Sequence, residues 1–447
     1  MHADARGYAV TLSRPAALDA YERAVHAFNT YRGDPLVPLD EALALDEGFA
    51  AAIATRALVL CSFLERRFMR EALATLERGR TALERATPRE RALAAAAQRI
   101  AEGEWRAGAL ALDEVLARDP LDIVALQTAH ILDFALGDAI CLRNRVSRVS
   151  PAWSATVPGY AYVLGMHAFG YEECNQYAEA ERAGRRALEL AGDDCWAVHA
   201  VAHVMEMQGR IDEGVAWFDA TRNVWSGKDN GFAYHNAWHL ALFHMDGGAH
   251  DKALEVFDAW LAGGGELAMT RLDATALLWR LMLEGVDIGG RMAPVADGWE
   301  ATLGDEGGFS AFNDFHAAMA FAAAGRREAL ERLRAIVARA AREPGDNGEM
   351  MRAVGAELCE AAIDYCDGRY AEAARRIAAV RDESARFGGS QAQRDLLALT
   401  LIEAATRAGD GALARHFVNE RLVHKPASAW GRRLFARASR EAALRAA

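Results

Sequence analysis

Hydrophobic and polar positions alternate along this chain with the spacing of amphipathic helices, and the helices recur in pairs. The first helix of each pair runs into a turn of glycine or asparagine, and the second helix starts directly after it. Two of the second helices begin Tyr-Ala-Glu-Ala, at Tyr177 and at Tyr370. Where the pattern is unbroken the turns are roughly 40 residues apart, at Gly137-Asp138, Asn175-Gln176, Gly209-Arg210, Gly247-Gly248, Gly325-Arg326, Gly368-Arg369 and Gly409-Asp410.

This period is close to the roughly 34 residues of a tetratricopeptide repeat (TPR), a helix pair that buries its apolar face only by stacking on its neighbours. We therefore expect an all-α protein, a right-handed and strongly curved α-solenoid of degenerate TPR-like helical hairpins. Residues 1–118 are less regular, although Thr87 followed by Pro88 is a strong helix start. Residues 119–447 form the predicted repeat array with a polar concave pocket, in one continuous solenoid with the first part.

Composition narrows the classes of function. The net charge of −12 and the pI near 5.6 argue against nucleic-acid binding, which requires a basic surface. The apolar stretches are too short to span a membrane, and the first twenty residues contain no apolar run that would indicate a signal peptide. The six cysteines form no C-x-x-C pair, which is typical of reduced thiols, so the expected location is the cytoplasm.

Histidine gathers in two neighbouring helical segments, residues 195–209 and 232–247. A helix turns by 100° per residue, so side chains spaced by three, four or seven residues share one stripe of each segment. A histidine near a carboxylate is also the minimal unit of acid–base catalysis. The candidate catalytic residues on these stripes are His199, His203, Glu206, His235 and His239.

The same spacing suits a divalent metal such as Zn, Fe or Mn. Two imidazoles lie one turn apart and a carboxylate follows on the next turn, and imidazole and carboxylate are common ligands of these metals. The alternative is a buried network in which these side chains satisfy one another. The expected metal ligands are His199, His203, Glu206 and His239.

Further polar residues lie in first helices, which line the inner surface of a TPR array. Among them, Asp273 and Arg280 share one stripe, and they are either an ion pair that braces neighbouring helices or a clamp for a substrate carboxylate or phosphate. The candidate ligand-binding residues are Glu173, Asn236, Trp238, Asp273, Arg280, Asn313, Asp314 and His316.

Several of these segments resemble the tetratricopeptide repeat protein 38 family, in the same order and over essentially the whole chain. The resemblance implies a degenerate TPR α-solenoid, and it brings no reaction with it, because the family is named for its repeats. The segments that carry it are Phe169 to Tyr177, Trp196 to Met207, His235 to His239, Leu278 to Gly285, Phe312 to His316 and Gly388 to Asp395.

Three hypotheses for function remain. The first is a non-catalytic scaffold for protein–protein interaction, although the inner wall is poor in the lysines that TPR grooves use for peptide ends. The second is a hydrolase or another acid–base enzyme, with or without a metal, whose pocket takes a small polar molecule or the end of a peptide. The third is a purely structural polar network. A homodimer, in which a second copy of the chain is the partner, is also open. Binding to nucleic acid or to a membrane is not expected.

Overall fold

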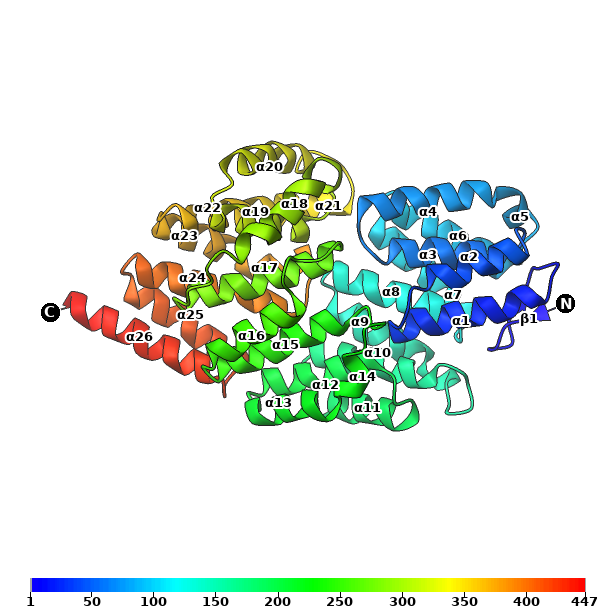
Figure 1. Cartoon of the computed structure of the whole chain (residues 1–447), viewed down its shortest axis with the longest axis horizontal. Coiled ribbons are helices and arrows are strands. Elements are labelled where there is room, and N and C mark those ends of the chain that lie inside the picture. The colour runs from blue at the N-terminus through cyan, green and yellow to red at the C-terminus, as the bar shows by residue number, and fades with distance from the viewer. Residues whose placement is uncertain (1, 447) are drawn as a thin grey trace. The chain divides into compact units, whose positions relative to one another are not determined.

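The computed structural model describes residues 2–446 of the chain, and these residues are almost entirely helical (Figure 1). The exception is a short antiparallel hairpin in which β1 (His2–Ala3) pairs with β2 (Ala9–Val10). Among the described residues, no helix combines the length and the apolar character needed to cross a bilayer. The all-α class and the TPR-like pairing of helices are confirmed.

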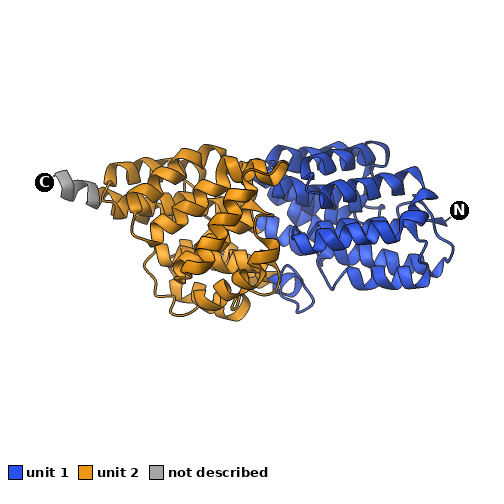
Figure 2. Cartoon of the chain, turned by 90° about the horizontal axis from the view of Figure 1, so that it is seen from above, with its two compact units in different colours: residues 1–201, 222–233 blue, residues 202–221, 234–447 orange. Residues whose placement is uncertain are grey.

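The chain divides into two compact units, coloured separately in Figure 2. The first unit contains residues 1–201 and 222–233, and the second contains residues 202–221 and 234–447. The division falls within α12 (Cys195–Met207).

The first unit is a series of helix pairs. α1 packs on α2, α3 on α4, α6 on α7 and α10 on α11, while α3 with α6 and α7 with α8 join successive pairs. Residues 222–233 belong to this unit because Gly231 N–H donates to Tyr31 O at 2.7 Å and Gly33 N–H donates to Asp229 O at 2.6 Å. The other helices of this unit are α1 (Ala16–Thr30), α2 (Leu36–Leu45), α3 (Ala50–Cys61), α4 (Arg66–Arg78), α5 (Arg80–Glu84), α6 (Pro88–Ala101), α7 (Trp105–Arg118), α8 (Ile123–Ala135), α9 (Ala139–Val149), the 3-10 turn η1 (Ser150–Ala152), α10 (Tyr160–Glu173), α11 (Tyr177–Leu190) and α14 (Arg222–Trp225).

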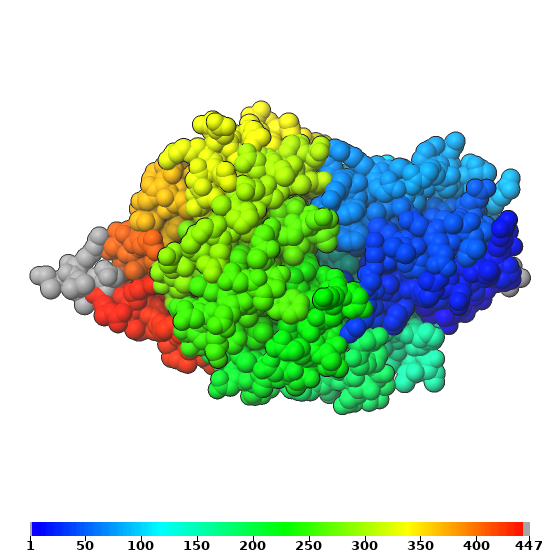
Figure 3. All heavy atoms as spheres, in the orientation of Figure 1, coloured from blue at the N-terminus to red at the C-terminus, as the bar shows by residue number. Residues whose placement is uncertain are grey.

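The second unit repeats this arrangement. α17 packs on α18, α19 on α20, α22 on α23 and α24 on α25, and α17 also contacts α24 from much later in the chain. Successive segments from residue 250 to residue 350 lie against one another in order in the space-filling view (Figure 3). The helices of this unit after α12 are α13 (Ile211–Ala220), α15 (Ala233–Asp246), α16 (His250–Trp260), α17 (Ala268–Leu283), α18 (Met292–Glu306), α19 (Ala311–Ala323), α20 (Arg327–Ala340), α21 (Asp346–Met350), the π turn η2 (Met351–Gly355), α22 (Ala356–Cys366), α23 (Tyr370–Val380), the 3-10 segment η3 (Arg381–Phe387), α24 (Gln391–Arg407), α25 (Gly411–His424) and α26 (Ala429–Ala446).

The seven turns predicted from the sequence share one geometry. Two residues after the first helix the backbone is left-handed, with φ from 60° at Asn175 to 81° at Gly248. The next N–H donates to a carbonyl five residues back, as Arg210 does to Met205 O at 2.9 Å, which is the bond that closes a Schellman motif. The same bond closes each of the seven turns predicted from the sequence, at Asp138, Gln176, Arg210, Ala249, Arg326, Arg369 and Asp410.

Two helix starts are fixed by capping boxes. Thr87 Oγ1 accepts from Glu90 N–H at 3.2 Å and the Glu90 carboxylate accepts from Thr87 N–H at 2.8 Å, so the start predicted for α6 is confirmed. Ser390 and Gln393 form the same box at the start of α24. This box anchors the end of α24 that lies against α17.

Candidate functional site

Three histidines of the second unit meet at one point in its interior. His203 projects from α12, and His235 and His239 project from α15 one turn apart. The ring centroids of His203 and His239 are 4.4 Å apart, and those of His235 and His239 are 4.9 Å apart. One ring nitrogen of each histidine lies within 4.8 Å of those of the others, and all three side chains are buried.

Two of these imidazoles are held by buried carboxylates. His235 Nδ1 contacts Asp273 Oδ2 of α17 at 2.7 Å, and His239 Nδ1 contacts Glu206 Oε2 of α12 at 3.0 Å. An ionised carboxylate only accepts, so each pair places the imidazole proton on Nδ1 and the lone pair on Nε2. The Nε2 atoms of His235 and His239 are therefore the atoms able to bind an electrophile.

Lys425, which follows α25, fixes the carboxylate behind His239. Its Nζ donates to Glu206 Oε1 at 2.7 Å and lies 3.3 Å from Asp395 Oδ2. Burial opposes ionisation of Glu206, but the charge of Lys425 outweighs it and holds the pKa of Glu206 below its ordinary value. Burial likewise opposes the charge of Lys425, and Asp395 and Glu206 reverse that effect and raise the pKa of Lys425. This ion pair therefore stays charged at neutral pH.

The charged groups continue from Lys425 towards the C-terminal end of α15. Arg421 donates to both oxygens of Asp395, at 2.7 and 2.8 Å, and to Ser428 Oγ at 3.1 Å. Ser428 Oγ donates to Asp246 Oδ1 at 3.0 Å. The segment between α25 and α26 is thus tied to both α12 and α15 by buried polar contacts.

His239 is a neutral imidazole rather than a cation at neutral pH. Burial lowers the pKa of His239 far below its usual range, and the neighbouring imidazoles and Lys425 lower it further. Burial raises the pKa of Asp273, and the contact with His235 opposes this rise. A neutral imidazole with Nδ1 backed by a carboxylate is the form that binds a metal through Nε2.

Of the two alternatives for Asp273 and Arg280, the ion pair between them is wrong. Asp273 binds His235, and no carboxylate of residues 2–440 lies within ion-pair distance of Arg280. Instead Arg280 Nη1 donates to Ala276 O at 3.1 Å, and Nη2 donates to Ala392 O at 2.8 Å and to Gln393 O at 3.2 Å. Its guanidinium lies over the ring of Trp238, 5.1 Å from the centroid.

Other predicted residues have different surroundings. His199 lies in the first-unit part of α12 and packs on Phe169, Trp196 and Phe232, with centroid separations between 4.8 and 5.2 Å. His316 donates from Nδ1 to Phe312 O at 2.8 Å, and burial lowers its pKa to about 4. The Asp314 carboxylate accepts from Gly308 N–H, which closes the loop before α19. The remaining predicted ligand residues are Asn236, buried on α15, Asn313, half-buried on α19, and Glu173, buried at the end of α10 in the first unit.

Comparison with known proteins finds distant structural similarity at low sequence identity. No family model matches the chain. The chain is similar to the human IFIT1 dimer with m7Gppp-AAAA, with a TM-score of 0.42 and 13% identity over 97% of this chain and 96% of that chain. It is also similar to the TPR domain of P58(IPK), with a TM-score of 0.21 and 12% identity over 72% and 99% of the two chains. For Naa15/Naa10 bound to HypK-THB the TM-score is 0.25, with 12% identity over 95% and 66%.

The chain is similar in fold to TPR-repeat proteins. The identities of 12–13% and the TM-scores below 0.5 do not extend this similarity to a function.

Sequence reasoning missed Lys425, although a signal for it is present. The chain uses arginine for nearly all of its 51 basic residues and has lysine at only three positions, Lys228, Lys252 and Lys425. Lys425 is buried beside Glu206, whereas Lys252 is exposed on α16. A rare residue type retained in an otherwise apolar turn would have been a reason to examine it.

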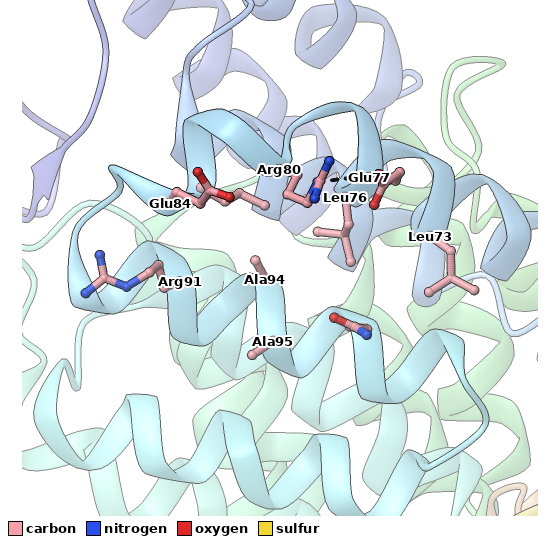
Figure 4. A pocket seen from close by; sticks show the side chains of 10 residues that line it. Leu73, Leu76, Glu77, Arg80, Glu84, Arg91, Ala94 and Ala95 are labelled. Atoms are coloured by element: carbon pink, nitrogen blue, oxygen red, sulfur yellow. Dashed lines mark ion pairs between the residues drawn. The ribbon is translucent and has the colours of Figure 1, made fainter.

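The first unit has a cavity of approximately 530 Å³ between α4, α5 and α6 (Figure 4). Leu73 and Leu76 line one side of it and Ala94 the other, while Arg80 and Glu77 form an ion pair of 3.5 Å at its rim. None of the predicted site residues lines this cavity.

Proposed function

We propose that the second unit binds a divalent transition metal, Zn, Fe or Mn, through His203, His235 and His239 and uses it to hydrolyse a small polar molecule or the end of a chain. The observation that carries the proposal is the pair of buried contacts from His235 to Asp273 and from His239 to Glu206. Metal-binding histidines almost always give their second ring nitrogen to such a partner. A third imidazole, His203, supports it from the facing helix.

The donor set fits these metals. Imidazole nitrogen is a common ligand of all three metals. One ring nitrogen of each histidine lies within 4.8 Å of those of the others, so the three side chains would hold one ion between them. The metal would supply Lewis-acid chemistry and would lower the pKa of a water molecule towards neutrality. This set shares His203 and His239 with the ligands predicted from the sequence and adds His235. Glu206 becomes the partner of His239, and the remaining predicted ligand, His199, belongs to the first-unit part of α12.

The surrounding residues have separate tasks in this proposal. Asp273 and Glu206 hold the two imidazoles in the tautomer that presents Nε2. Lys425 keeps Glu206 ionised and in place, because its ammonium binds the oxygen that does not contact His239.

We also propose that the chain is a divergent member of the tetratricopeptide repeat protein 38 family. The support is the order of its motifs, since Trp196 to Met207, His235 to His239 and Gly388 to Asp395 contain His203, His235, His239 and Glu206 and the α24 residues near Arg280. A cytoplasmic location belongs to the same proposal, because all six cysteines are free thiols.

The test of this function is turnover by metal-stripped and reconstituted full-length protein. The probes are 4-nitrophenyl acetate, bis(4-nitrophenyl) phosphate and an amino-acid 4-nitroanilide, each measured with zinc, manganese and iron(II). We expect hydrolysis of at least one probe only after reconstitution. We expect His239→Ala to abolish it and His244→Ala to retain it, because His244 lies half-buried on the same helix outside the set.

Equal rates before and after reconstitution would contradict the proposal, as would full activity in His239→Ala. Loss of stability in His239→Ala, with no metal and no turnover in the wild-type protein, would instead support the alternative of a structural polar network in a TPR scaffold.

A further inference from the structure

Arg280 differs from the other buried cations of the same region. Arg421 binds Asp395 through two hydrogen bonds, and Lys425 binds Glu206 at 2.7 Å. Arg280 is equally buried, but its hydrogen bonds go to the backbone carbonyls of Ala276, Ala392 and Gln393. Carbonyl oxygens satisfy N–H groups without neutralising the charge, so this cation lacks a counter-ion in contact.

The charge of Arg280 reaches the residues of the proposed metal site. It acts electrostatically on Glu206, His239, Asp273 and His316, which lie on three other helices and on its own. Burial lowers the pKa of Arg280 to about 10, which agrees with incomplete compensation of its charge. A guanidinium remains protonated at neutral pH under these conditions.

Trp238 supplies an independent observation beside Arg280. Its ring lies under the guanidinium and is stacked on His235, with centroids 5.4 Å apart. The side chain is fully buried, yet its Nε1–H has no acceptor among residues 2–446. A buried indole N–H normally donates a hydrogen bond. A guanidinium with no carboxylate in contact and an indole donor with no acceptor thus occur side by side.

We infer that the ligand of this site is an oxyanion, a carboxylate or a phosphate, whose charge is bound by Arg280 and one of whose oxygens accepts from Trp238 Nε1–H. The guanidinium and the indole both donate to oxygen, and planar guanidinium suits either anion. The inference rests on the proposed function, because it places the ligand at the metal held by the three histidines. That the ligand is an oxyanion is inferred from Arg280 and Trp238.

The experiment is calorimetric titration of zinc-loaded and zinc-free protein with acetate, inorganic phosphate and acetamide. Acetamide matches acetate in shape without its charge. We expect at least one of the two anions to bind the zinc-loaded protein about 10-fold or more tightly than acetamide, and Arg280→Gln to remove that preference. Arg271→Gln is the matched control, because Arg271 is also buried on α17, lies over Trp299 and donates to the Glu266 carbonyl.

Two further variants keep the test decisive if Arg280→Gln fails to fold. Arg280→Lys retains the charge and lacks the planar fork, so weaker binding of the preferred anion is expected. Trp238→Phe retains the ring and removes only the N–H, so we expect a loss of about 2- to 10-fold in anion affinity. Equal anion binding by the wild type and these variants would overturn the inference, as would no anion binding by the wild type.

The zinc content of each sample separates this inference from the proposed function. If the wild type holds zinc and the Arg280 and Trp238 variants bind anions as well as it does, the proposed metal site stands and the oxyanion inference fails. If the wild type retains no zinc but binds anions through Arg280, the oxyanion inference stands and the proposed metal site fails.

Discussion

Histidines at equivalent repeat positions have different environments in the two units. In the first unit, His130 packs edge-on against Phe169 and Trp196, and His167 binds Ser147 Oγ at 2.9 Å while stacking on Tyr171. In the second unit, His239 lies at the same position two repeats later than His167 and binds Glu206. All of them are buried, so burial does not distinguish the units.

The difference lies in what faces the ring. Burial lowers the pKa of His130 to about 3 and that of His167 to about 4, and within residues 2–440 neither ring binds a carboxylate. Neutral imidazoles in aromatic surroundings fill space and are poor candidates for chemistry. The repeat therefore supplies a histidine at regular intervals. His239 differs from His130 and His167 by the carboxylate that α12 places against its ring.

The largest effect is expected for Lys425, the buried cation that binds Glu206. Lys425→Ala leaves Glu206 buried without its ammonium partner and should lower the free energy of unfolding by about 3–5 kcal/mol. Lys252→Ala removes an exposed lysine and should change it by less than about 0.5 kcal/mol. The free energy of unfolding of both variants is measured by urea denaturation. Equal values for Lys425→Ala and Lys252→Ala would show that the ion pair of Lys425 with Glu206 makes no net contribution to stability.

The next effect concerns the carboxylate behind His235. Asp273→Asn keeps the shape of the side chain and weakens its hold on the imidazole proton, so zinc affinity should fall about 10- to 100-fold. The comparison variant is Asp133→Asn in the first unit, where the carboxylate binds Arg145 at 2.8 and 2.9 Å. Zinc affinity is measured by competition against a zinc chelator, and Asp133→Asn should bind zinc as tightly as the wild type. An equal loss of zinc affinity in Asp133→Asn would mean that the loss does not come from the contact with His235.

A carboxylate can also be added to the first unit. Ser147→Asp places one next to His167 and should raise the pKa of that histidine from about 4 by roughly 1 to 2. The measurement is an NMR titration of the imidazole resonances, with Ser147→Asn as the uncharged control. An unchanged pKa would show that the carboxylate opposite the ring does not determine its protonation.

The smallest effect is a pH dependence. The folded-state pKa of His130, about 3, lies below the unfolded value near 6.5, so only the unfolded chain takes up this proton between those values. Its contribution to stability is complete above about pH 6.5 and is lost as the pH falls, by about 1.4 kcal/mol per pH unit. Comparing unfolding at pH 7 and pH 5, His130→Phe should lose less stability than the wild type. Parallel losses would contradict this sign.

Local geometry made much of the fold predictable. The left-handed turns at positions such as Gly209 and Asn175, and the capping box at Thr87, depend on residues within one helical turn. The grouping of His235 with His239 follows from helix periodicity for the same reason. These features need no knowledge of how one helix packs on another.

Contacts between helices were the part that sequence could not supply. The contact of His235 with Asp273 depends on the packing of α15 on α17, and spacing alone suggested the wrong partner, Arg280. The contact of Lys425 with Glu206 joins segments 219 residues apart. Both depend on the register in which repeats stack, which a single sequence does not specify.

The most direct test of the metal site is the metal content of untagged protein, determined by elemental analysis for the wild type, His239→Ala and His130→Ala. The account predicts close to one Zn, Fe or Mn per chain in the wild type and in His130→Ala, and almost none in His239→Ala. Equal metal content in the two variants, or a metal-free wild type after reconstitution, would contradict it.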